Sequence, residues 1–186
     1  SEQTRSQLRR AKYQDEIDFL VRNDARNRFI CNLCTSLDGN TLTLFNFVDK
    51  HGKVLYNMLQ DANKPVFFVH GGVKGEDRNE IRQIVENKKT SIIVASYGTF
   101  STGINIRNLH NIVFASPSKS RVRNLQSIGR GLRRTSSKRE ARLFDLVDDL
   151  RYKQWKNYSL HHFTERLKIY NEEQFPYKMY QVDLKE

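Results

Sequence analysis

The chain has 186 residues, of which 38% are hydrophobic and 28% charged, and its formal net charge is +11. This length suits one domain with an extension, or two small domains, that can bury a core. No apolar run approaches the roughly 20 residues that a membrane span needs, and the N-terminus lacks a signal-peptide pattern. Residues 116–139 carry eight Lys or Arg and no acid, so we expect a nucleic-acid partner and no membrane.

Residues 1–37 contain neither Gly nor Pro and predict a helical lead-in, with Asn23 as a cap between two apolar stripes. Cys31 and Cys34 have the C-x-x-C spacing of a zinc half-site or a redox pair. Zinc needs four ligands, and no second Cys or His pair follows at finger spacing. We therefore interpret the two cysteines as small buried side chains of a helix in a reducing, cytoplasmic protein.

From residue 38 to about 150, short β-branched or apolar runs alternate with helical stripes. We expect strands at residues 41–48, 66–69, 91–95, 111–115 and 141–147, and helices at 54–59, 76–87 and within 117–140. This alternation is typical of an α/β fold with an open, mostly parallel sheet flanked by helices.

Three details of this part are specific enough to test. The continuous apolar run 66–69 predicts a strand that is buried on both faces. Ile84 is expected on the buried side of helix 76–87, together with Ile81 and Val85. Asp148 and Asp149 are placed to cap the helix that follows the last strand.

Three polar segments follow strands of the predicted sheet: a glycine-rich loop at 70–75, a loop with hydroxyl side chains and glycines at 96–106, and the basic helix. The carboxyl ends of parallel strands share one edge, where ligands bind in open sheets. Glycines allow close approach of the backbone, and helix N-termini can hold phosphate. Each loop could instead be a simple turn, and the basic helix a solvated surface, but their convergence favours a phosphate-binding edge.

Residues 151–186 form an aromatic and basic extension. A helix is predicted that ends before Pro176, and residues 177–184 could form a last edge strand. The aromatic side chains could stack on unpaired bases, but we expect them to pack an added helix against the domain. The predicted divisions are thus 1–37, 38–150 and 151–186.

Residues 102–106 (Thr-Gly-Ile-Asn-Ile) and 126–133 (Gln-Ser-Ile-Gly-Arg-Gly-Leu-Arg) resemble motifs V and VI of the superfamily 2 helicases, in the right order and spacing. Residues 41–48 are similar to motif IV. The resemblance extends over about residues 24–150 and implies the second RecA-like motor lobe of an ATP-dependent DNA helicase. Within the family, the chain most resembles bacteriophage enzymes that unwind DNA and migrate its branches in recombination and repair, in the cytoplasm of the host cell.

The resemblance also implies roles for individual residues. Arg133 would be the arginine finger at the γ-phosphate of ATP, with Arg130 beside it, because a guanidinium stabilises charge that builds up during phosphoryl transfer. Further ATP-site positions would be Gly103, Gln126 and Asn105, the last standing where the family usually has Asp. Nucleic-acid phosphates would face Gly71, Lys74, Ser96, Thr99 and Ser101.

The sequence contains no G-x-x-x-x-G-K-[ST] loop and no D-E-x-H run. ATP and Mg²⁺ would therefore be held mainly by a first lobe, the chain's other partner besides nucleic acid, and the chain alone is expected to be inactive. We expect no metal site. The alternative is a non-catalytic nucleic-acid-binding module that uses the basic helix and the aromatic tail. A dinucleotide-binding enzyme is disfavoured because no G-x-G-x-x-G follows a strand.

Overall fold

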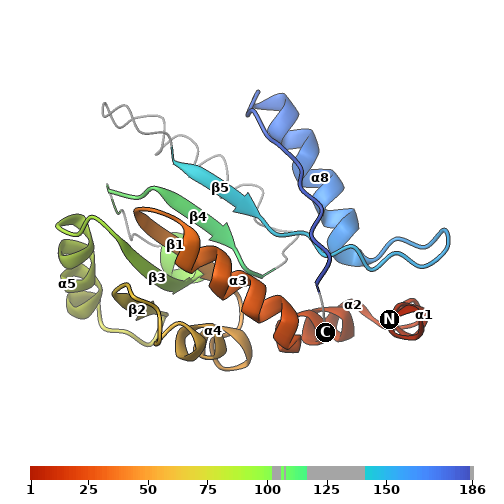
Figure 1. Cartoon of the computed structure of the whole chain (residues 1–186), viewed down its shortest axis with the longest axis horizontal. Helices are drawn as coiled ribbons and strands as arrows, with labels where there is room; N and C mark the ends of the chain where they lie inside the picture. The colour runs from red at the N-terminus through yellow and green to blue at the C-terminus, as the bar shows by residue number, and fades with distance from the viewer. Residues whose placement is uncertain (102–105, 107, 117–140, 185–186) are drawn as a thin grey trace.

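The structure is a computed structural model that describes residues 1–101, 106, 108–116 and 141–184 (Figure 1). Its helices and strands follow one another largely as the sequence predicts. In chain order they are α1 (Glu2–Leu8), α2 (Tyr13–Arg22), α3 (Asp24–Ser36), β1 (Asn40–Phe45), the π-helix η1 (Val48–Gly52), α4 (Lys53–Met58), β2 (Val66–Val69), α5 (Gly75–Glu86), β3 (Ser91–Ser96), α6 (Tyr97–Ser101), β4 (Asn111–Phe114), β5 (Arg142–Asp145) and α8 (Tyr158–Glu172).

The five strands form one sheet in the order β2-β3-β1-β4-β5, and every neighbouring pair is parallel. β1 lies at the centre, where Leu42 is paired with Ile93 on one side and with Ile112 on the other. The side chains of β1 and β4 are buried throughout, as expected for strands covered on both faces. The predicted parallel α/β sheet is confirmed.

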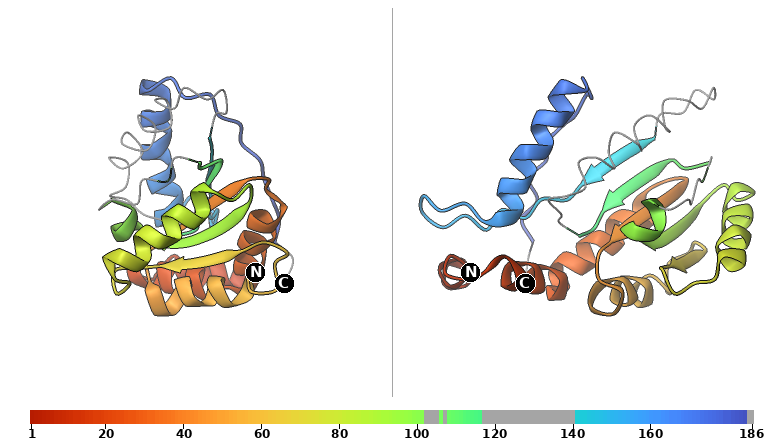
Figure 2. Two further views of the ribbon diagram at one scale, coloured as in Figure 1. Left: turned by 90° about the vertical axis from the view of Figure 1, so that its left-hand side faces the viewer. Right: turned by 180° about the vertical axis from the view of Figure 1, so that it is seen from behind.

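Helices cover both faces of the sheet and make a three-layer structure. One face packs against α3 and α4, whose buried side chains include Ile30, Cys34 and Leu55. The other face packs against α5 and α8 through Val85 and Tyr170. Figure 1 shows α3 crossing the sheet, and Figure 2 shows α5 and α8 toward opposite edges of it. The hydrophobic core therefore consists of two apolar layers, one on each face of the sheet.

The first three helices form as the sequence predicts. Asn23 caps α3, since its side-chain oxygen accepts a hydrogen bond from the Arg26 amide at 2.8 Å. Cys31 and Cys34 are both buried free thiols, and Cys34 contacts the Thr43 hydroxyl of β1 at 3.1 Å. Burial raises the pKa of Cys31 to about 12 and that of Cys34 to about 11. The interpretation of the two cysteines as buried small side chains is confirmed.

Two predictions about burial are wrong. β2 is an edge strand with one neighbouring strand. Three of its four residues are therefore only partly buried, and only Val69 is fully buried. Ile84 is 37% exposed, whereas Val85 is fully buried and Ile81 packs on the core. An apolar run indicates a strand, but it does not fix the place of that strand in the sheet.

Three local predictions after the central strands are also wrong. The predicted loop after β3 begins as the short helix α6. Asp148 and Asp149 do not cap a helix, because Asp148 binds Arg26 and Asp149 binds Arg151, and α8 begins only at Tyr158. Residues 177–184 form no strand, although α8 does end before Pro176 as predicted. The domain boundaries at residues 37 and 150 stay a prediction.

Candidate functional site

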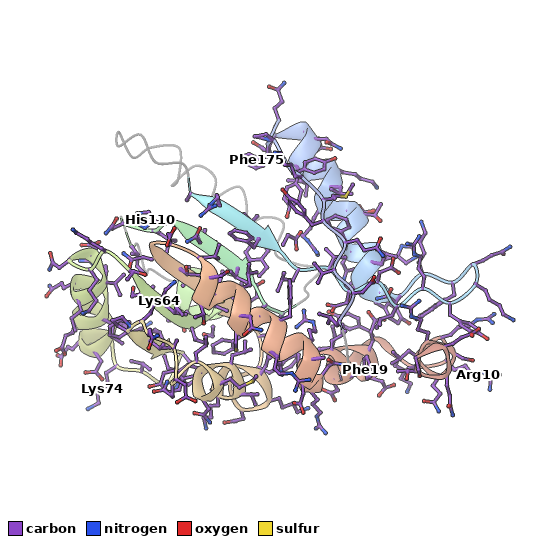
Figure 3. All side chains as sticks on the ribbon, viewed as in Figure 1. Arg10, Phe19, Lys64, Lys74, His110 and Phe175 are labelled. Atoms are coloured by element: carbon purple, nitrogen blue, oxygen red, sulfur yellow. The ribbon has the colours of Figure 1, made fainter. Side chains whose placement is uncertain are left out.

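The carboxyl ends of the parallel strands share one edge of the sheet, and the polar segments singled out in the sequence follow them. The loop at residues 70–74 follows β2, α6 follows β3, and Ser116 follows β4. Lys74 ends the loop that follows β2, whereas His110 precedes β4 and belongs to the opposite ends of the strands; Figure 3 labels both residues. The predicted convergence is therefore present for the described part of these segments.

The loop after β2 leaves an open stretch of backbone at Gly71. A Cβ atom built on Gly71 would meet no heavy atom within 4 Å, and the residue is exposed. Lys74 is the N-cap residue of α5 in an extended conformation and is also exposed. Glu76 and Asp77 occupy the first turn of α5 and already offset the positive end of the helix dipole. This loop can approach a phosphate chain through Gly71 and Lys74, but it is not a strong anion site by itself.

The hydroxyl groups of Ser96 and Thr99, at the end of β3 and in α6, bind to each other. The Ser96 and Thr99 oxygens are 2.6 Å apart, and the Ser96 oxygen also accepts from the Thr99 amide at 3.4 Å, which caps α6. Thr99 is 3% exposed, and only Ser96 is partly open to solvent. Ser101 belongs to α6, but its side chain lies outside the described part of the chain. The pair therefore shapes the start of this segment, with Ser96 as its more accessible member.

A buried histidine that no sequence motif indicated anchors the end of β4. His51 Nδ1 lies 2.8 Å from the Ser116 hydroxyl, and Nε2 lies 3.2 Å from Asn27 Oδ1. The Asn27 amide nitrogen already donates to the Val21 carbonyl, so its oxygen must accept from Nε2–H and Nδ1 must accept from the serine. Burial, with a smaller effect of the Arg26 charge, lowers the pKa of His51 to about 3, so the ring is neutral.

Two more hydrogen bonds hold Ser116. Its hydroxyl oxygen accepts from the Asn46 amide at 3.1 Å, and its carbonyl accepts from the Tyr97 hydroxyl at 3.2 Å. Ser116 is thus tied to η1, to the end of β1 and to α6. Because residue 117 begins the basic segment, this cluster fixes the point from which that segment leaves the sheet.

A second buried cluster fixes the end of β5, just after the basic segment. Arg166 of α8 binds both oxygens of Asp145 at 2.7 and 3.0 Å, and the Tyr170 hydroxyl donates to the same carboxylate at 2.8 Å. Burial would lower the pKa of Arg166, but the charge and hydrogen bonds of Asp145 raise it, so the guanidinium keeps its charge. Burial and the nearby carboxylate also raise the pKa of Tyr170. The aromatic extension packs on the sheet here, as expected.

Five predicted ATP-site positions, which are Gly103, Asn105, Gln126, Arg130 and Arg133, lie outside the described residues. Their roles stay predictions. Within the described ranges, no group of three or more His, Cys, Asp or Glu side chains could hold a metal ion, and no helix is long and apolar enough to cross a membrane.

Comparison with known proteins identifies the fold and the family. The helicase conserved C-terminal domain family matches residues 25–135. The ATP-dependent DNA helicase UvsW of Enterobacteria phage T4 is 38% identical over 192 residues, which cover 96% of this chain and 38% of UvsW. The crystal structure of T4 UvsW superposes with a TM-score of 0.86 at 36% identity, over 99% of this chain and 40% of that one.

More distant relatives share the fold alone. The E. coli DEAD-box protein SrmB is 18% identical and has a TM-score of 0.56, over 67% of this chain and 71% of that one. The chain spans less than two fifths of UvsW, so the comparison concerns one lobe of a larger enzyme. Since the family match covers more than half of the chain and includes the strands β1 to β4, the chain belongs to the helicase conserved C-terminal domain family and is a RecA-like second helicase lobe.

Proposed function

We propose that the chain is the second motor lobe of an ATP-dependent DNA helicase that also migrates DNA branches in recombination and repair. The observation that carries this proposal is the similarity to T4 UvsW, named an ATP-dependent DNA helicase, over 96% of the chain. The first RecA-like lobe of the same protein would hold ATP and Mg²⁺. Such an enzyme would act in the cytoplasm, where its ATP and DNA are.

Arg130 and Arg133 would supply the catalytic charges of this lobe. Charge builds up on the transferred phosphate oxygens, and a desolvated guanidinium can contribute a rate factor on the order of 10³ to 10⁵. Gln126, Gly103 and Asn105 would complete the nucleotide side of the lobe. Asn105 can donate and accept hydrogen bonds to a sugar hydroxyl, but it lacks the charge of the usual Asp.

The two buried clusters support a rigid presentation of these arginines. Ser116 is held by His51, Asn46 and Tyr97 immediately before the basic segment, and Asp145 is held by Arg166 and Tyr170 shortly after it. A catalytic group must be positioned to within about 0.5 Å by elements that do not move themselves. The clusters would thus anchor both ends of the segment that carries Arg130 and Arg133.

Nucleic acid would pass over the exposed part of the strand edge. Gly71 and Lys74 are exposed there, Ser96 is partly exposed, and Ser101 lies on α6. Thr99 would act indirectly, because its buried hydroxyl fixes Ser96. DNA is favoured over RNA by the similarity to UvsW, and branched DNA would be among the substrates.

The test is ATP turnover by the intact protein, which is the proposed longer protein with both motor lobes, and by the 186-residue chain alone. Each is assayed with linear duplex DNA, a four-way DNA junction or RNA. We expect turnover only by the intact protein, with DNA and above all with the junction as activators. ATP turnover by the chain alone would contradict the proposal that the first lobe holds ATP and Mg²⁺ while this lobe supplies the arginines. DNA binding by the intact protein without any DNA-stimulated turnover would instead support the non-catalytic binding module.

A further inference from the structure

A second basic surface lies away from the residues discussed so far, at the N-terminal helix. α1 and its end carry three exposed arginines, and the turn at residues 150–156 beside it carries three more exposed cations. This surface, the α1 patch, consists of Arg5, Arg9, Arg10, Arg151, Lys153 and Lys156. Figure 1 and Figure 2 both show α1 and this turn at the same end of the molecule, the end toward which β4 and β5 point.

The two parts of the α1 patch enclose an open cavity of about 410 Å³. Its lining includes Arg5 from α1, and Arg151 and Lys153 from the turn, around the partly buried ring of Tyr152. Arg9 follows Arg5 by one helical turn and lies on the same side of α1. Figure 3 shows Arg10 at this end of the molecule.

Most positive charge of the α1 patch is not neutralised by the described part of the chain. Asp149 is paired with Arg151, whose hydrogen bonds lower the pKa of that carboxyl with a smaller contribution from Arg5. Glu2 is the other acid beside the cavity. Arg5, Arg9 and Lys153 form no ion pair with any described acid. The surface therefore attracts an anion with several charges.

The turn holds Lys153 in a conformation that is unfavourable for a lysine. Tyr152 and Trp155 exchange two backbone hydrogen bonds of 3.0 and 3.1 Å, and Lys153 between them has a φ of 53°. Gly or Asn is the usual residue in this left-handed region, because a side chain there costs free energy. Strain of this kind often occurs where a side chain serves a binding function. Here it places an ammonium group at the tip of the turn.

We propose that the α1 patch is a second contact surface for the DNA backbone, next to the strand edge and separate from it. The proposal rests on the proposed function for the identity of the polyanion. Guanidinium and ammonium groups without an acidic partner, such as those of Arg5, Arg9 and Lys153, fit the repeating phosphates of a duplex, which release bound counterions when these cations replace them. The position of the patch beyond the ends of β4 and β5 would extend the path of the DNA over this end of the lobe.

The salt dependence of DNA binding tests this surface. The intact protein without ATP is titrated against a labelled duplex at several salt concentrations, as wild type and as the double variant Arg5→Gln/Lys153→Gln. Each phosphate contact contributes about 0.9 to the slope of log K against log salt, so the slope should become less negative by about 1.8. The matched control Arg28→Gln/Lys89→Gln removes the same charge from exposed positions elsewhere and should leave the slope unchanged.

The variant Lys153→Gly separates lost contacts from lost folding. Glycine accepts the φ of 53° without strain, so the melting temperature should stay the same or rise, while the slope becomes less negative by about 0.9. An unchanged slope in both variants would overturn the proposal. A lower melting temperature of the double variant with an unchanged slope would do so as well, and would indicate a contact with another part of the protein. If the slope changes as expected but the wild-type protein does not turn over ATP, the α1 patch is still a DNA contact and the proposed motor function is refuted instead.

Discussion

Glu16 connects the two ends of the chain, and we expect its hydrogen bonds to contribute more to stability than any other connection between these ends. This fully buried residue of α2 accepts four hydrogen bonds, from the Asn157 amide group, the Tyr158 and Ser159 backbone amides and the Ser159 hydroxyl, at 2.7 to 3.0 Å. Tyr158 and Ser159 are the first residues of α8, and the Asn157 side chain does not cap that helix. A carboxylate from the other end of the chain therefore caps α8, where negative charge is favourable.

Replacing Glu16 by Ala should lower the free energy of unfolding by about 3–5 kcal/mol. Hydrogen bonds to a charged group contribute about 1.5–3 kcal/mol each, and each buried donor left unpaired costs about 1–3 kcal/mol, but the four bonds are not additive. Glu16→Gln keeps one oxygen that can serve the three donors at Oε1, and it places an amide group against the Tyr158 N–H. Its cost should be smaller, about 1–3 kcal/mol.

Urea unfolding followed by circular dichroism measures these values, and thermal melting gives an independent reading. A loss of 3–5 kcal/mol should lower the melting temperature by roughly 10 °C, since 1 kcal/mol corresponds to about 2–4 °C in a domain of this size. The exposed Glu80→Gln serves as the control and should leave the midpoint unchanged. A Glu16→Ala protein as stable as wild type would refute the assignment of Glu16 as the cap of α8.

Three further predictions concern other buried groups. Because the pKa of His51 is lowered to about 3, the unfolded chain binds more protons than the folded one between pH 3 and 6.5. The contribution of the neutral His51 to stability is therefore present above pH 6.5 and is lost by up to about 1.4 kcal/mol per pH unit as the pH falls. His51→Gln should flatten this part of the pH profile of urea unfolding, and an unaltered profile would contradict the burial of a neutral His51. Gly52→Ala fits the helical backbone but brings a Cβ within 2.5 Å of the buried Phe45 ring. The free energy of unfolding should fall by about 1–3 kcal/mol in the same assay, whereas a higher free energy of unfolding would show that the ring can shift freely. Cys31 and Cys34 should resist alkylation by iodoacetamide at pH 8 until the protein is unfolded, because burial raises both thiol pKa values; rapid labelling of the folded protein would contradict their burial.

The elements that the sequence predicted well are those with a strong local pattern. β3 and β4 are short, β-branched and apolar, and their burial follows from that composition. The cap at Asn23 depends on residues three positions apart, so a local reading was sufficient. The place of β2 at the edge of the sheet depends on strand order, which residues 66–69 do not encode by themselves.

The buried polar clusters could not be predicted, because their members are distant in the sequence. Glu16 binds residues more than 140 positions away, and His51 binds Ser116 across 65 positions. A lone buried Glu or His in a helical stripe looks like an ordinary surface residue until its partners are placed. Asp148 was likewise expected to cap a helix because of its position, whereas its partner Arg26 lies at the other end of the lobe's sequence.

At the strand edge, sequence motifs predicted where the polar segments lie but not which of their side chains are exposed. The described parts of these segments converge as predicted, because the parallel strands end at a common edge. The accessibility of single hydroxyls did not follow, since Ser96 and Thr99 are hydrogen-bonded to each other and Thr99 is buried. A motif identifies the segment that carries the chemistry, and packing decides which of its side chains face the ligand.

The central claim is that this lobe contributes an arginine finger to ATP hydrolysis, and ATP turnover by the intact protein with Arg133→Ala tests it most directly. We predict a loss of DNA-stimulated turnover by a factor on the order of 10³ or more, with little change in DNA affinity. The adjacent Arg134→Ala, which removes the same charge, should keep most of the activity. The account would be contradicted if Arg133→Ala turned over ATP as wild type does, or if its main effect were weaker DNA binding with a flatter salt dependence.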